Sequence, residues 1–154
     1  MPAPIIALIL AVIALDQWTK SLVRAHLQMP RVYAGGLLTL VFTQNEGAFL
    51  SLGANLSPAA RMLVFTFAVG IAVAVALWIL IKQRVHGIDA IAVALIAAGG
   101  IGNLIDRVMF HGRVTDFIYL AAGPLHTGVF NVADMAITSG VIWLVISSFA
   151  PKKS

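Results

Sequence analysis

The stretch GVFNVADMAIT, residues 128–138, opens a segment that is almost wholly apolar as far as Phe149. It nevertheless carries Asn131 and Asp134, three residues apart. A charged residue in the middle of a span costs ~3 kcal/mol to insert into a membrane, and ionisable residues there usually serve function. Asp134 has no basic residue within four positions on its own segment. It is therefore the first candidate for a functional carboxylate.

The composition indicates a small protein that crosses a membrane several times. Hydrophobic residues make up 60% of its 154 residues, and charged residues only 10%, which is unlike a soluble domain. The Lys and Arg residues are scattered, so no nucleic-acid partner is expected. The absence of cysteine excludes thiol nucleophiles and disulfides. The histidines lack the HExxH spacing of zinc peptidases, and neither a metal nor an organic cofactor is expected.

Four segments are long and apolar enough to span a bilayer, which takes about 20 residues. They are, approximately, Pro4–Leu22, Arg61–Ile81, Ile88–Val108 and Val129–Phe149. The first lacks the basic start and the cleavage site of a removed signal peptide, so we expect it to be retained. No repeat or linker divides the chain. We therefore predict a membrane all-α fold, one domain over residues 1–154 built on a four-transmembrane-helix bundle.

Two of the connections contain sequence typical of β-strands. LLTLVFT (37–43) and AFLSL (48–52) flank a predicted turn at Asn45–Gly47, and RVTDFIYL (113–120) lies between the last two spans. Backbone that is neither helical nor part of a closed barrel avoids the hydrocarbon layer. We therefore expect a small β-structure at a membrane surface.

Polar residues of the spans gather at one end of the predicted bundle. They are Asp16, Thr19 and Lys20 at the end of the first span, Asn103, Asp106 and Arg107 at the end of the third, and Asn131 and Asp134 at the start of the fourth. Because successive spans alternate in direction, these ends and the two long loops fall on the same side. Residues three or four apart share a helix face, so the sequence predicts one polar cluster. Within it we expect Lys20 to pair with Asp16, and Arg107 with Asp106.

Two carboxylates are sufficient for peptide hydrolysis in such a cluster. Held close together where water is restricted, they cannot both ionise easily and share a proton. One then takes a proton from water while the other protonates the leaving amide. Asp134 with Asp116, brought over it by the third loop, suits this chemistry, and so does Asp16 with Asp106. The spacing alone does not choose between the two pairs.

Five motifs, in order and spacing, resemble the lipoprotein signal peptidase family, signal peptidase II. They are DQWTK (16–20), NEGAF (45–49), GNLIDR (102–107), GRVTDF (112–117) and FNVAD (130–134), and the resemblance runs nearly from end to end. It implies an aspartyl endopeptidase of the bacterial inner membrane that removes signal peptides from diacylglyceryl-modified prolipoproteins. Cleavage would fall just before the lipid-modified cysteine.

The resemblance also implies which residues form the site. The catalytic dyad would be Asp116 and Asp134. The residues that line or support it would be Asp16, Lys20, Asn45, Gly47, Asn103, Arg107 and Asn131. The family usually has two small residues before the aromatic residue of NEGAF, whereas Phe49 here follows Ala48 directly. We therefore leave Phe49 out of the site.

Charge counting alone does not orient the chain in the membrane. Four basic residues lie on the side opposite the cluster and six on its own side, or four against four once Lys20 and Arg107 are discounted as paired. The resemblance implies that both termini are cytoplasmic, and that the active site faces the periplasm beneath a small β-cradle. It further implies membrane lipids and lipid-modified precursors as partners and inhibition by globomycin-type cyclic peptides. We expect a monomer.

Two other functions are compatible with an intramembrane polar cluster. One is a small proton-coupled transporter that uses Asp16 and Asp134 as a relay, and the other is an assembly factor whose cluster only joins helices. The transporter is disfavoured because the polar residues stop at one end, whereas a transit path needs both halves of the membrane.

Overall fold

The computed structural model describes residues 1–46 and 57–149. Its four long helices are α1 (Ala3–His26), α2 (Pro58–Ile81), α3 (Gly87–Met109) and α4 (Val132–Phe149). Each is long and apolar enough to cross a membrane, and the four agree with the predicted spans to within a few residues. The chain is thus a multi-pass membrane protein, as predicted from its sequence.

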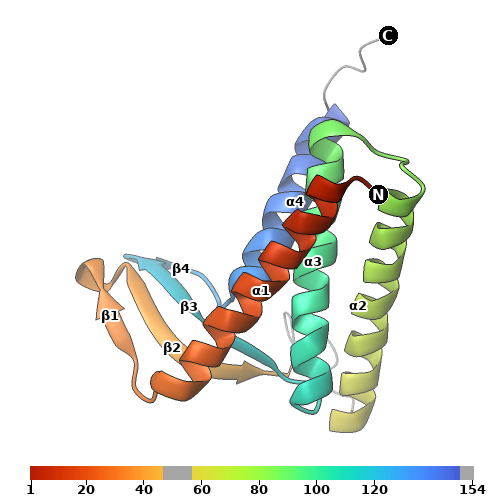
Figure 1. Ribbon diagram of the computed structural model, residues 1–154. Helices are drawn as coiled ribbons and strands as arrows, with labels where there is room; N and C mark the ends of the chain where they lie inside the picture. The colour runs from red at the N-terminus through yellow and green to blue at the C-terminus, as the bar shows by residue number, and fades with distance from the viewer. Residues whose placement is uncertain (47–56, 150–154) are drawn as a thin grey trace.

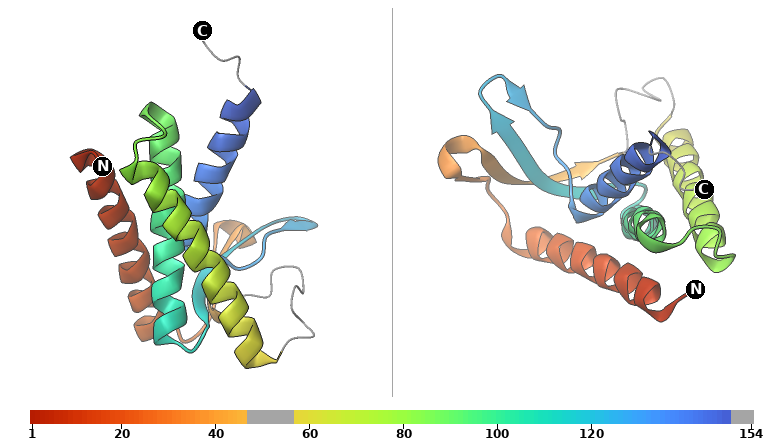
Figure 2. Two further views of the ribbon diagram at one scale, coloured as in Figure 1. Left: turned by 90° about the vertical axis from the view of Figure 1, so that its right-hand side faces the viewer. Right: turned by 90° about the horizontal axis from the view of Figure 1, so that it is seen from above.

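Helix α3 lies at the centre of the bundle. It packs against α1, α2 and α4, and α1 also meets α4, whereas α2 packs extensively only against α3. The view from above shows α3 between the other three helices (Figure 2). Small residues make this possible: Ala94, Ala97 and Ala98 are fully buried, and small side chains let transmembrane helices approach closely.

Two glycines mark the closest contact between α3 and α4. A Cβ added to Gly99 would lie 2.3 Å from the carbonyl oxygen of Ala133, and one added to Gly140 would lie 2.5 Å from the carbonyl oxygen of Ala92. Both contacts are with backbone, which cannot move aside as a side chain can. The two helices therefore depend on glycine at both ends of their interface.

The bundle has two different ends (Figure 1). The start of α1, the end of α4 and the connection between α2 and α3 lie at one end, and a small sheet lies beside the other. The sheet is antiparallel, in the order β1-β2-β3-β4. Its strands are β1 (Arg31–Tyr33), β2 (Leu38–Asn45), β3 (Val114–Ala122) and β4 (Leu125–His126), with a 3₁₀ turn at Ala34–Gly36 between the first two.

The centre of the sheet joins the two long loops. β2 pairs with β3 from Leu38 opposite Leu120 to Asn45 opposite Val114, with an irregularity between Leu40 and Thr43. The sequence predicted strands in both loops, and β2 and β3 confirm this. β2 pairs with β1 of its own loop on one side and with β3 of the other loop on the other, and the predicted strand at 48–52 lies outside the described residues. β1 and β4, at the two edges, were not predicted.

The helix contact at Gly140 provides a test of the packing. We expect Gly140→Ala to lower the melting temperature by about 3–10 °C, because overpacking a close contact costs about 1–3 kcal/mol. Gly70→Ala is the matched control, because a Cβ there meets nothing within 4 Å and alanine is the better helix former. Thermal unfolding in detergent measures both, and equal melting temperatures for the two variants would contradict this account of the interface.

Candidate active site

The first turn of α4 explains why an apolar helix begins with polar residues. The side-chain oxygen of Asn131 accepts the backbone N–H of Asp134 at 2.9 Å, and Oδ2 of Asp134 accepts the backbone N–H of Asn131 at 3.2 Å. This reciprocal pair is a capping box with Asn and Asp in the capping positions. Oδ1 of Asp16, on α1, accepts a further free N–H from Ala133 at 2.9 Å. Side-chain oxygens therefore bind the backbone N–H groups of Asn131, Ala133 and Asp134 at the helix start.

Asp116 is brought to the same place by β3. The backbone N–H groups of Phe117 and Ile118 both donate to the carbonyl of Phe130, and Phe130 donates back to Ile118. These bonds fix β3 against the segment that enters α4. Nδ2 of Asn131 then donates to Oδ1 of Asp116 at 2.6 Å.

Asn131 thus contacts both carboxyl groups of the predicted dyad. Its side-chain nitrogen binds Asp116, and its side-chain oxygen and backbone N–H bind Asp134. Asn103 and Asn45 contribute one donor each: Nδ2 of Asn103 to Oδ1 of Asp134 at 2.8 Å, and Nδ2 of Asn45 to Oδ2 of Asp116 at 3.0 Å. Residues from β2, β3, α3 and α4, far apart in the sequence, therefore meet at one site.

A buried ionic cluster contacts Asn103. Nζ of Lys20 lies 2.8 Å from Asp16 and 3.7 Å from Asp106, and all three side chains are fully buried. Lys20 also donates to Oδ1 of Asn103 at 2.9 Å. Gly102 leaves room for the cluster, because a Cβ there would lie 2.6 Å from Oδ2 of Asp16. The predicted pair of Lys20 and Asp16 is confirmed.

The predicted pair of Arg107 and Asp106 is wrong. Asp106 instead meets Lys20 and Arg24, each at 3.7 Å, because adjacent residues on a helix face different directions. Arg107 is 9% exposed, and its Nε donates no hydrogen bond to any residue in the described part of the chain. The carboxylates of Asp134, Asp116 and Asp106 all attract its guanidinium. It is a buried cation with a free donor beside the site.

The geometry separates the two carboxylate pairs that the sequence left open. Asp16 and Asp106 are fully buried, and both face Lys20, so a cation already balances their charges. Asp116 and Asp134 lie above this cluster and are joined through Asn131. This arrangement favours Asp116 and Asp134 as the reactive pair.

The buried position of Asp116 changes its protonation. Removal from water raises the pKa of Asp116 to about 6, and the negative charge of Asp134 adds to the rise. Hydrogen bonds from Asn45 and Asn131, and the charge of Lys20, act in the opposite direction. Asp116 therefore keeps its proton at a higher pH than an ordinary aspartate.

Sequence reasoning missed three residues that shape this site. Nε2 of Gln17 donates to Asp16, to Asp106 and to the carbonyl of Gly102, at 3.0–3.2 Å. Arg24 and Thr115 bind each other at 3.0 Å. Gln17 and Thr115 adjoin Asp16 and Asp116 in the sequence, which was their one signal, whereas Arg24 carried none. Gly47, by contrast, was predicted at the site and lies outside the described residues.

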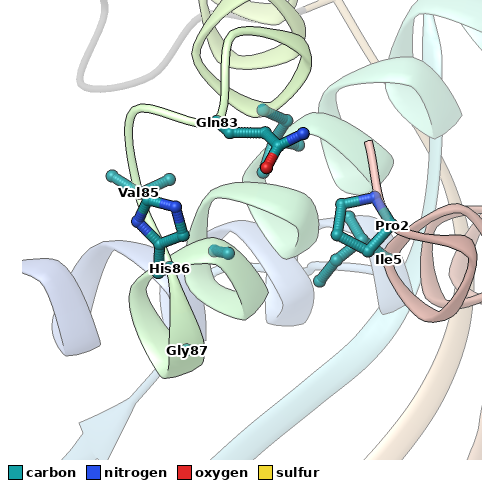
Figure 3. Close-up of a pocket in the computed structure, with 8 residues that line it drawn as sticks. Pro2, Ile5, Gln83, Val85, His86 and Gly87 are labelled. Carbon is teal, nitrogen blue, oxygen red and sulfur yellow. The ribbon is translucent and has the colours of Figure 1, made fainter.

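A small cavity at the opposite end of the bundle is separate from this site. It measures about 130 Å³ and lies between the start of α1 and the α2–α3 connection (Figure 3). Its lining residues are Pro2, Ile5, Leu80, Gln83, Val85, His86, Gly87 and Ala90. None of these is a carboxylate. Within residues 1–46 and 57–149, no three His, Asp or Glu side chains are grouped as metal ligands would be.

Comparison with known proteins assigns this chain to a family. The family model for signal peptidase (SPase) II matches residues 8–150. The chain belongs to the signal peptidase II family. A lipoprotein signal peptidase of Syntrophus aciditrophicus (strain SB) is 37% identical over 145 residues, covering 92% of this chain and 89% of the relative. That of Azoarcus sp. (strain BH72) is 40% identical over 142 residues, covering 90% and 78%.

The fold agrees with the same family. A bacterial membrane enzyme structure solved by the in meso method at 2.3 Å resolution superposes with a TM-score of 0.81 at 28% identity, covering 98% of this chain and 93% of the other. The chain is therefore a signal peptidase II, an aspartic peptidase. This confirms the function inferred from the motifs and removes the basis for the transporter and the assembly factor.

The ionic cluster beneath the site of this signal peptidase II gives a second prediction. We expect Lys20→Met to destabilise the protein by about 3–5 kcal/mol, because it leaves the buried carboxylate of Asp16 without a counter-ion and leaves Asp106 with Arg24 alone. Arg113→Gln is the control: it breaks the ion pair between Arg113 and Glu46, which are both about half exposed, and such pairs contribute little. Thermal unfolding of the two variants should differ by about 10 °C, and similar melting temperatures would refute a structural role for the cluster.

Proposed function

We propose that Asp116 and Asp134 form the catalytic dyad of this peptidase, which cleaves diacylglyceryl-modified prolipoproteins just before the lipid-modified cysteine. The observation that carries this proposal is the double contact of Asn131, whose side chain and backbone hold both carboxyl groups. No other pair of carboxylates in the described residues is both joined in this way and free of a cation within ion-pairing distance.

The environments of the two carboxyl groups suggest different roles. Asp134 accepts hydrogen bonds on both oxygens and lies in the first turn of a helix, where the dipole favours negative charge. Asp116 has its pKa raised to about 6 by burial and by the charge of Asp134. In our proposal, Asp134 takes a proton from water, and the resulting hydroxide equivalent attacks the scissile carbonyl. Asp116 gives its proton to the leaving nitrogen.

The supporting residues hold the dyad and contact the substrate. Asn131, Asn103 and Asn45 fix the carboxyl groups by the hydrogen bonds described above. Asp16 and Lys20 hold the start of α4 and Asn103. Arg107 is suited to bind a substrate carbonyl or the developing oxyanion, because its Nε has no hydrogen-bond partner among residues 1–46 and 57–149. From the motif alone, we also propose that Gly47 lines or supports the site.

The orientation follows from a revised count of charges. Of the six basic residues on the side of the site, Lys20 and Arg24 are held by Asp106, Arg113 by Glu46, and Arg107 is buried among carboxylates. This leaves at most Arg31 and Arg61 in the count, against four basic residues on the other side. We infer that both termini are cytoplasmic and that the site faces the periplasm of the bacterial inner membrane. We further propose that the protein is a monomer, that it contacts membrane lipids, and that globomycin-type cyclic peptides inhibit it.

The dyad is tested by removing one carboxylate at a time. We expect Asp116→Asn and Asp134→Asn each to lower cleavage of a lipid-modified precursor by at least about 1,000-fold, since neither variant can complete both proton transfers. Release of the signal peptide by purified protein measures this, with thermal unfolding as the check on folding. Near-normal turnover by either variant would exclude the dyad.

The raised pKa of Asp116 predicts a pH dependence. Because Asp116 must hold its proton to act as the acid, kcat/KM should fall as pH rises above about 6. The hydrogen bond from Asn45 stabilises the carboxylate and so lowers the pKa of Asp116. Asn45→Ala should therefore move the alkaline limb to higher pH, by up to about one unit. A shift to lower pH, or none, would contradict the assignment of Asp116 as the acid.

A further inference from the structure

Thr115 is the most firmly held residue of β3, and it directly precedes Asp116. It is 1% exposed. Its backbone N–H donates to Oδ2 of Asp106 at 2.8 Å, and its carbonyl accepts from Nδ2 of Asn131 at 3.3 Å. Its hydroxyl accepts from a guanidinium nitrogen of Arg24 at 3.0 Å. Every polar group of this residue is therefore bound to a different element of the fold.

Arg24, near the end of α1, is itself fixed in place. Its guanidinium carbon lies 4.7 Å from the centre of the Phe110 ring, and its NH1 lies 3.7 Å from Oδ1 of Asp106. A cation over an aromatic face and beside a carboxylate has little freedom to rotate. The hydrogen bond to Thr115 thus connects two groups that are already ordered.

The side chain of Thr115 does not approach the dyad itself. Successive side chains of a strand point to opposite faces, so the hydroxyl of Thr115 faces the helix ends while the carboxyl of Asp116 faces Asn131 and Asn45. A hydrogen bond at Thr115 therefore acts on Asp116 only through the backbone that they share.

We propose that Arg24 and Thr115 are positioning residues for the reaction: their hydrogen bond locks β3 against α1 and so fixes the carboxyl group of Asp116. This inference rests on the proposed role of Asp116 as the catalytic acid. Proton transfer is sensitive to placement, because a displacement of about 1 Å can cost about 100-fold in rate. A contact that only positions the acid leaves substrate binding unchanged, so in this proposal the effect falls on kcat.

The test compares isosteric and conservative changes at one position. Thr115→Val removes the hydroxyl at nearly constant volume, and Thr115→Ser keeps it. We expect Thr115→Val to lower kcat about tenfold with KM within about twofold of the wild type, and Thr115→Ser to retain kcat within about twofold. Thr39→Val on β2 is the control, since it removes a hydroxyl from the same sheet that makes no hydrogen bond among the described residues.

A double variant tests whether the two residues act together. Arg24→Gln should lower kcat at least as much as Thr115→Val, and Arg24→Gln with Thr115→Val should be no slower than Arg24→Gln alone, because the contact is already lost. Multiplied losses in the double variant would show that the two residues act separately and would overturn the proposal. If Thr115→Val does not fold, Thr115→Ala against Thr115→Ser makes the same comparison.

The outcomes also separate this inference from the dyad. If Asp116→Asn is inactive and Thr115→Val turns over as fast as Thr39→Val, the dyad stands and the positioning contact is wrong. If KM rises while kcat stays constant, the contact serves binding, and the proposal is likewise overturned. If Asp116→Asn retains turnover, the dyad itself fails.

Discussion

The start of α4 is the constraint on which the rest of the site depends. A helix leaves its first backbone N–H groups without partners, and near hydrocarbon each unpaired group is costly. Asn131, Asp134 and Asp16 supply the acceptors. Because Asp16 comes from α1, this capping also joins the first and last helices. The polar residues of the motif FNVAD therefore complete a helix end and place a carboxylate at the same time.

The buried charges follow from that arrangement. Asp16 must remain a hydrogen-bond acceptor to hold α4, and Lys20, one turn along α1, balances its charge. Asp106 brings a second negative charge, which Arg24 and Lys20 share, and Gln17 donates to both carboxylates. A partly satisfied network of this kind costs more than an apolar core. Near-complete pairing is what makes it stable, and Arg107, with its free Nε, is the exception beside the site.

Much of the architecture is readable from the sequence because bilayer physics leaves few alternatives. Length and apolar composition defined the four helices, and alternation of direction placed Asp16, Asn103 and Asn131 at one end. The pairing of β2 with β3 was not predictable, since strand partners far apart in the sequence are chosen by tertiary packing. The same limit explains the absence of Thr115 from the predicted site, whereas the pairing of Arg107 with Asp106 was wrong for a local reason, because adjacent residues on a helix face different directions. Such contacts depend on side-chain directions that only the assembled helices define.

The pairing of β2 with β3 has a consequence for biosynthesis. Asp116 sits on a strand whose neighbours, Asn45 on one side and Asn131 on the other, are separated by most of the chain. During translation the first loop emerges early, but the segment that anchors β3 from the other side belongs to the last helix. The proposed dyad therefore lacks one carboxyl group and the side chain of Asn131 until the start of α4 has been made. If the proposed dyad is correct, a nascent chain that has inserted only its first three spans has no peptidase activity.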